Sequence, residues 1–147
     1  MSLTINEKWL RGSLVAIVII HFIVALWHGL THLEAPVPLT DSQTAFVFIV
    51  ILLLPFIGVG FLWSKWQRAA VWLIALCMLA SLLFGFINHF MLSGTDDYVL
   101  NVPAHMGQYW FIFTAALLVG VETIGTMIPF MILRVTRHYH QKHSIAA

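Results

Sequence analysis

The sequence predicts an all-α integral membrane protein, a four-helix bundle whose successive helices run antiparallel, up and down. Of its 147 residues, 61% are hydrophobic and 9% are charged, whereas soluble domains carry about 25% charged residues. Four segments, 12–33, 43–64, 69–92 and 106–134, are long and apolar enough to span a bilayer, because a span needs about 20 mostly apolar residues. They use nearly all of the chain, so we expect residues 1–147 to form a single transmembrane domain.

The basic residues predict how the bundle is oriented. All seven lie before the first span, between the second and third, or at or beyond the end of the fourth: Lys8, Arg11, Lys65, Arg68, Arg134, Arg137 and Lys142. The charged residues of the other two loops are all acidic. Because cytoplasmic loops are enriched in Lys and Arg, we expect both termini in the cytoplasm and a multi-pass protein of the inner cell membrane. The net charge of +1 gives no reason to expect nucleic-acid binding.

The first two spans carry clear boundary signals. The first, 12–33, should end before Pro36, because a residue that precedes proline avoids helical geometry. It is longer than the apolar core of a signal peptide, so we expect it to remain as an anchor. The second, 43–64, opens with a capping box at Thr40 to Gln43. Pro55 lies inside it and is expected to kink the helix.

The last two spans follow a short turn and a longer loop. The turn before 69–92 is short, so the second and third helices should be antiparallel neighbours. Ser93 and Gly94 should end the third helix. The fourth span, 106–134, contains Pro129, which is expected to bend it near its cytoplasmic end.

Histidines within the first and third spans converge at similar depths. His21, His28 and His32 share one stripe of the first helix, since separations of seven and eleven residues leave offsets of only about 20°. At a rise of about 1.5 Å per residue, His89 lies between His28 and His32 in depth, near the outer face. Glu122 lies near the midplane, level with His21. Ionised groups at mid-bilayer cost about 2.5–3.5 kcal/mol, so these polar residues are candidates for function.

The outer layer predicts a metal centre near the periplasmic face. Neutral imidazole suits copper, iron and zinc, and His28 and His32 occupy i and i+4 of one helical face. With His89 they are the expected ligands of a transition metal. Residues that could complete the shell are His105, Glu34, Asp96 and Asp97. An open position would let the ion carry out redox chemistry or activate water or dioxygen for a lipid-soluble substrate. Ordinary hydrogen bonding between helices is the alternative for these histidines.

Other functions are compatible with the same residues. A b-type haem could be held by His89 with His28 or His21, passing electrons to quinone or a docked protein. The chain could also be an accessory subunit of a larger membrane redox complex, or a homo-oligomer, with its polar stripe facing partner helices. His21 and Glu122 are predicted either to relay protons beside the metal or to form a structural hydrogen bond. The sequence leaves open whether the chain is an enzyme.

Overall fold

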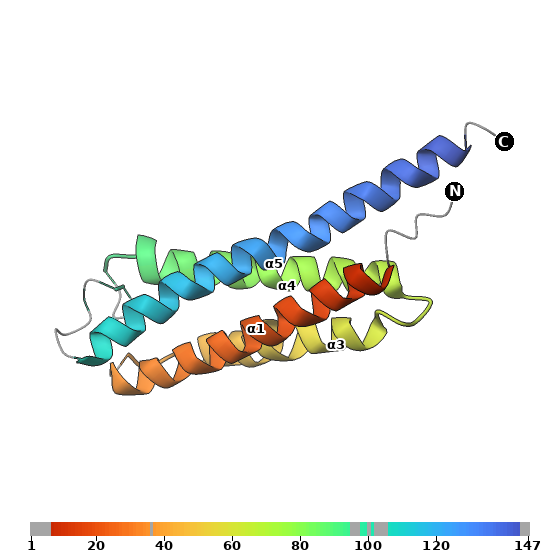
Figure 1. Ribbon diagram of the computed structural model, residues 1–147. Helices are drawn as coiled ribbons and strands as arrows, with labels where there is room; N and C mark the ends of the chain where they lie inside the picture. The colour runs from red at the N-terminus through yellow and green to blue at the C-terminus, as the bar shows by residue number, and fades with distance from the viewer. Residues whose placement is uncertain (1–6, 36, 95–97, 100, 102–105, 145–147) are drawn as a thin grey trace.

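Four membrane-length helices lie side by side in the computed structural model of the protein, and the described residues contain no strand (Figure 1). The structure describes residues 7–35, 37–94, 98, 99, 101 and 106–144. The segments long and apolar enough to cross a membrane are Lys8–Glu34, Asp41–Phe61, Gln67–Met91 and Gly107–Arg134. The predicted all-helical class is therefore confirmed, together with four helices that are long and apolar enough to span a membrane.

The first helix, α1, runs over Glu7–Glu34 and ends just before Pro36, as the sequence predicts. One face of α1 carries buried polar side chains, whereas the opposite face exposes large apolar ones such as Ile23 and Leu30. An exposed apolar face is what a helix needs where it borders lipid. The helix therefore turns its histidines inward and its aliphatic residues outward.

The second span begins with the predicted capping box. Helix α2, Asp41–Phe46, starts after Thr40, whose hydroxyl accepts from the backbone N–H of Gln43. The Gln43 side chain in turn accepts from the backbone N–H of Thr40 at 2.8 Å. Two backbone donors of the first turn are thereby satisfied.

Pro55 disrupts the second span through a widened turn. The π-helical segment η1, Val47–Leu53, precedes helix α3, Leu54–Phe61. Leu54 N–H donates to the carbonyl of Ile49, five residues back. Proline has no N–H and clashes with the carbonyl four residues earlier, and a wider turn upstream relieves that clash. The expected kink thus takes the form of a π-helical stretch.

The third and fourth spans pack closely on the others. Helix α4, Gln67–Phe86, continues into the π-helical segment η2, Ile87–Met91, and helix α5 covers Met106–Ser144. Helix α5 packs against both α1 and α4, and α3 packs against α4. At Gly58 of α3, a Cβ atom would lie 2.7 Å from Cγ1 of Ile74, so only glycine permits this approach of α3 to α4.

Apolar clusters at both ends enclose the polar residues. Helix α1 begins and α5 ends at the same end of the bundle (Figure 1); we name the opposite end, where α1 ends and α5 begins, the distal end. A large cluster that includes Leu14, Val18 and Met78 fills the bundle near the start of α1. A smaller cluster at the distal end includes Val37 and Phe111. The buried histidines lie between the two clusters along α1.

Candidate metal centre

Three buried histidines converge at the distal end of the bundle. His28 and His32 come from successive turns of α1, and His89 comes from η2. Nε2 of His28 lies 3.1 Å from Nε2 of His89 and 3.2 Å from Nε2 of His32. One possible ligand atom from each of the three lies within 4.8 Å of the other two. None of these residues is more than 8% exposed, so all three rings are buried.

A widened helical turn carries His89 to the other two histidines. In η2, Leu92 N–H donates to the carbonyl of Ile87, five residues back, at 3.0 Å. The side-chain amide of Asn88 donates to the carbonyl of Phe84 at 2.8 Å, and this carbonyl also accepts from the backbone N–H of Ile87. π-helical turns within helices occur frequently at functional sites. The extra residue in the turn changes the direction in which His89 projects from the helix.

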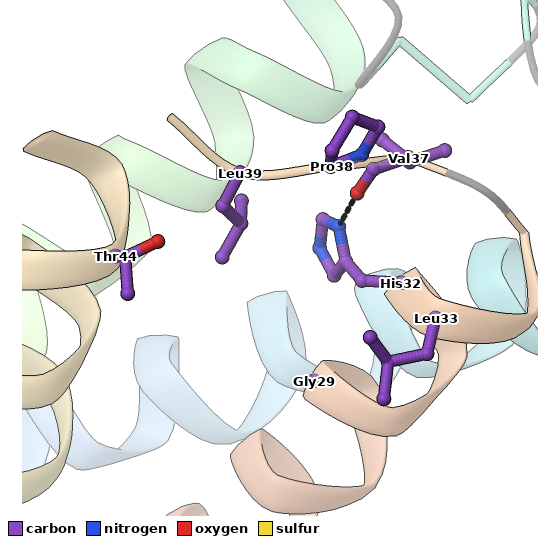
Figure 2. Close-up of a pocket in the computed structure, with 7 residues that line it drawn as sticks. All are labelled: Gly29, His32, Leu33, Val37, Pro38, Leu39 and Thr44. Carbon is purple, nitrogen blue, oxygen red and sulfur yellow. Dashed lines mark hydrogen bonds between the residues drawn. The ribbon is translucent and has the colours of Figure 1, made fainter. Parts of the chain in front are cut away.

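Hydrogen bonds on the far side of two rings hold them in place. Nδ1 of His32 lies 2.9 Å from the carbonyl oxygen of Val37, which can only accept (Figure 2). Nδ1 of His28 lies 2.8 Å from the Thr114 hydroxyl, which donates its own hydrogen to the carbonyl of Trp110 at 2.7 Å. Nδ1 of His32 therefore carries the ring hydrogen and its Nε2 presents a lone pair. His28 takes the same tautomer when the Thr114 hydroxyl donates to Trp110.

The facing lone pairs have the geometry of a metal site. In these tautomers the Nε2 atoms of His28 and His32, which lie 3.2 Å apart, both present lone pairs, and a cation bound between them would accept both. Nitrogens bound at about 2.0–2.1 Å to a tetrahedral ion lie about 3.3–3.4 Å apart. The observed separations of 3.1 and 3.2 Å are close to that value. Metal-bound histidines also usually donate their second ring N–H to a fixed acceptor, as His28 and His32 do here.

A buried phenylalanine covers one side of the cluster. The ring centroid of Phe111 lies 5.2 Å from that of His28, 4.9 Å from that of His32 and 5.1 Å from that of His89. Phe111 is completely buried and belongs to the distal apolar cluster. An apolar wall of this kind controls solvent access and lowers the local dielectric constant around a bound ion.

A second polar cluster lies nearer the middle of the bundle. Nε2 of His21 on α1 lies 3.3 Å from Oε1 of Glu122 on α5, and the Ser81 hydroxyl of α4 donates to the same oxygen. None of the three residues is more than 2% exposed. The other carboxylate oxygen of Glu122, Oε2, has no hydrogen-bond partner among the described residues. The anticipated pairing of His21 with Glu122 is thus observed, and it joins three helices.

A cavity of about 60 Å³ extends from one cluster to the other. The three clustered histidines line one part of it, and Ser81 and Glu122 line another. Gly85, which lies between Ser81 and His89 along the chain, also lines it, and a Cβ atom at Gly85 would lie 4.0 Å from Oε2 of Glu122. Phe111 is not part of this lining. The imidazoles therefore have an apolar ring on one side and open space on another.

A larger groove of about 520 Å³ reaches the histidine cluster from outside the bundle (Figure 2). It lies between α1, the segment that follows α1, and α2. Its lining residues are Gly29, His32, Leu33, Val37, Pro38, Leu39 and Thr44. Gly29, His32 and Leu39 also line the smaller cavity. The groove and the cavity therefore share a wall that includes one of the three histidines.

The remaining predicted ligands are not part of this cluster. Glu34 is exposed at the end of α1 and does not belong to the group of three histidines. His105, Asp96 and Asp97 lie outside the described residues. His21, considered as an axial haem ligand, contacts Glu122 and Ser81 instead.

Sequence reasoning missed the hydrogen-bond partners of the histidines. Thr114 could have been found from helix register. His21 of α1 faces Glu122 of the antiparallel helix α5. Seven residues further along α1 is His28, and eight residues earlier in α5 is Thr114, which faces it. The carbonyl of Val37 carries no comparable signal, because any residue type supplies the same backbone oxygen.

Comparison of the sequence with models of known protein families, with curated proteins and with solved structures finds no match. The three histidines, their hydrogen-bond partners and the spaces beside them are therefore the features from which a function can be inferred.

Proposed function

We propose that this protein is a membrane metalloprotein in which His28, His32 and His89 bind one transition-metal ion. The observation that carries this proposal is the approach of their Nε2 atoms, at 3.1 and 3.2 Å, in a buried site. The two α1 rings turn lone pairs toward that point and keep their ring hydrogens on the far side. Copper, iron and zinc are the ions that suit such neutral imidazole ligands.

The ion has an open coordination position in this proposal. Catalytic zinc sites use three protein ligands and leave the fourth position for water or substrate. The cavity beside the three imidazoles supplies space for that fourth group, whereas Phe111 occupies the other side of the rings. A metal in this setting can make bound water acidic or, if it is redox-active, can bind dioxygen. The proposed function is therefore activation of water or dioxygen.

The position of the groove favours a lipid-soluble substrate. It reaches His32 from the outside of a helix pair whose exposed side chains are mostly apolar, so a molecule dissolved in the membrane could approach without crossing water. The bias of basic residues favours a periplasmic position for the site and cytoplasmic termini. Association with quinone, with further copies of the chain or with a larger complex stays a prediction.

The same distances favour a single ion over b-type haem. Two axial imidazoles on opposite sides of an iron atom have Nε2 atoms about 4 Å apart, at about 2 Å for each bond, with the macrocycle in the plane between them. His28 and His89 hold these atoms 3.1 Å apart, and the 60 Å³ cavity beside them is small. The third histidine, His32, has no place in a two-ligand haem site.

Elemental analysis of the protein purified without a metal-chelating resin tests the proposal. The wild-type protein is expected to retain about one equivalent of copper, iron or zinc. His28→Ala, His32→Ala and His89→Ala should each lose most of it, whereas the control His21→Asn, which changes a buried histidine of the same helix, should retain it. Circular dichroism on the same samples checks that each variant is folded. Metal content that is negligible in the wild type, or unchanged in all three variants, would contradict the proposal.

A further inference from the structure

We propose that Glu122 takes up a proton from a molecule bound at the open position of the metal, through a short chain of water in the cavity that joins the two polar clusters. The inference rests on the proposed metal centre and assigns a role to the second cluster. For bound water, one O–H bond breaks, hydroxide stays on the ion, and the proton adds to Oε2 of the Glu122 carboxylate. Charge and atoms balance without an oxidant or reductant.

The two oxygens of Glu122 have different surroundings. Oε1 receives the Ser81 hydroxyl and lies 3.3 Å from Nε2 of His21, so its position is fixed. Oε2 is buried and has no hydrogen-bond partner among the described residues. A buried carboxylate oxygen without a partner is costly. The contacts of Oε1 are sufficient to join the helices, and Oε2 is available to exchange a proton.

The cavity is the right size for a water chain. Its volume of about 60 Å³ exceeds several-fold the roughly 10–15 Å³ that one water needs, so two waters fit. The seven-residue step from His21 to His28 corresponds to about 10 Å along α1, and three hydrogen bonds through two waters span about 8 Å. Both ends of the cavity are polar, with imidazole at one and carboxylate at the other, as an ordered water requires.

Few titratable groups around Glu122 could exchange a proton with its carboxylate. His21 from α1 and Ser81 from α4 both contact Oε1. The other titratable residues that line the cavity are the three clustered histidines, His28, His32 and His89. The lining contains no lysine or arginine, so no fixed positive side chain there competes for Oε2. We therefore take the molecule bound beside the histidines as the proton donor to Oε2.

Infrared spectroscopy with azide as the probe tests the coupling on the zinc-loaded protein in lipid vesicles. Azide at the open position reports its own binding through its stretching band, and the carboxyl bands report the state and hydrogen bonding of Glu122. Glu122→Gln identifies which carboxyl band belongs to this residue. Gly85→Ala adds a methyl group near Oε2 of Glu122 and leaves the histidines intact. Gly120→Ala is the matched control, because Gly120 is exposed and nothing lies within 4 Å of its Cβ position.

Azide binding is expected to change the Glu122 band in the wild type and in Gly120→Ala. The change should be lost in Glu122→Gln and reduced in Gly85→Ala while the metal-bound azide band persists in both. A metal-bound azide band with no response from Glu122 would overturn the inference and leave the metal centre standing. A response in Gly85→Ala equal to that of the wild type would overturn the water chain. Absence of both bound zinc and bound azide would refute the metal centre itself, and the inference with it.

Discussion

The substitution Thr114→Val tests whether the tautomer of His28 is set for metal binding. Valine keeps the shape of threonine but removes the hydroxyl that lies 2.8 Å from Nδ1 of His28. Thr114 is completely buried and His28 is 6% exposed, so water does not replace the lost acceptor. An unsatisfied buried donor costs about 1–3 kcal/mol, and loss of such a partner typically lowers metal affinity about 10–100-fold. We therefore expect a weakening of about 1.4–2.7 kcal/mol at about 1.4 kcal/mol per tenfold.

Competition with a chromophoric chelator measures this change directly. The matched control is Thr123→Val, because Thr123 lies on the same helix and its hydroxyl donates to a backbone carbonyl at 2.6 Å, but it is exposed and away from the histidines. The control should bind zinc as tightly as the wild type. Equal affinity in Thr114→Val and Thr123→Val would refute the assignment of His28 as a ligand oriented through Nδ1.

Three further predictions concern the structure around the site. Phe111→Ala should lower the free energy of unfolding in detergent by about 3–5 kcal/mol, because it empties a fully buried ring site; no loss of stability would show that the distal end is not packed as described. Gly58→Val should cost about 1–3 kcal/mol through overpacking against Ile74, whereas Gly60→Val, which meets nothing within 4 Å, should be milder when both are measured by the same unfolding assay. Asn88→Leu should weaken zinc binding in a competition titration, because it removes the amide that supports the widened turn of His89; unchanged affinity would show that the turn forms without it.

The fold was largely predictable because its cause is local and repeated. Each of the four spans is an uninterrupted apolar segment, and lipid leaves the backbone little alternative to a helix. The ends of the helices followed from Pro36 and from the capping box at Thr40. The π-helical stretches were not predicted, because a single additional residue in a turn leaves the composition and the length of a span unchanged.

Those features of the site that depend on helical periodicity and on depth in the membrane were predictable from the sequence. Helical periodicity placed His28 and His32 on one stripe, and the rise per residue placed His89 at their depth. The direction of His89 was not predictable from regular helical geometry, because His89 lies within η2, where the widened turn changes the angular positions of the residues. Phe111, the carbonyl of Val37 and the cavity depend on how separate segments pack, and no periodic pattern encodes that packing.

The two clusters also explain how these polar groups are accommodated in a membrane-spanning bundle. The ring hydrogens of His28 and His32 have acceptors within the protein, and Oε1 of Glu122 has two partners. Hydrogen bonds between membrane helices contribute about 0.6 kcal/mol on average, so they offset only part of the cost of burying these groups. Within the two clusters, Oε2 of Glu122 is the buried atom that has no hydrogen-bond partner among the described residues, and the proposed chemistry assigns a role to it.

X-ray absorption spectroscopy of the zinc-loaded protein in lipid vesicles tests the central claim most directly. The account predicts zinc surrounded by three imidazole nitrogens at about 2.0–2.1 Å and one oxygen atom from solvent, and one imidazole fewer in His89→Ala. A shell of oxygen atoms alone, or an unchanged number of imidazoles in the triple variant at His28, His32 and His89, would contradict it.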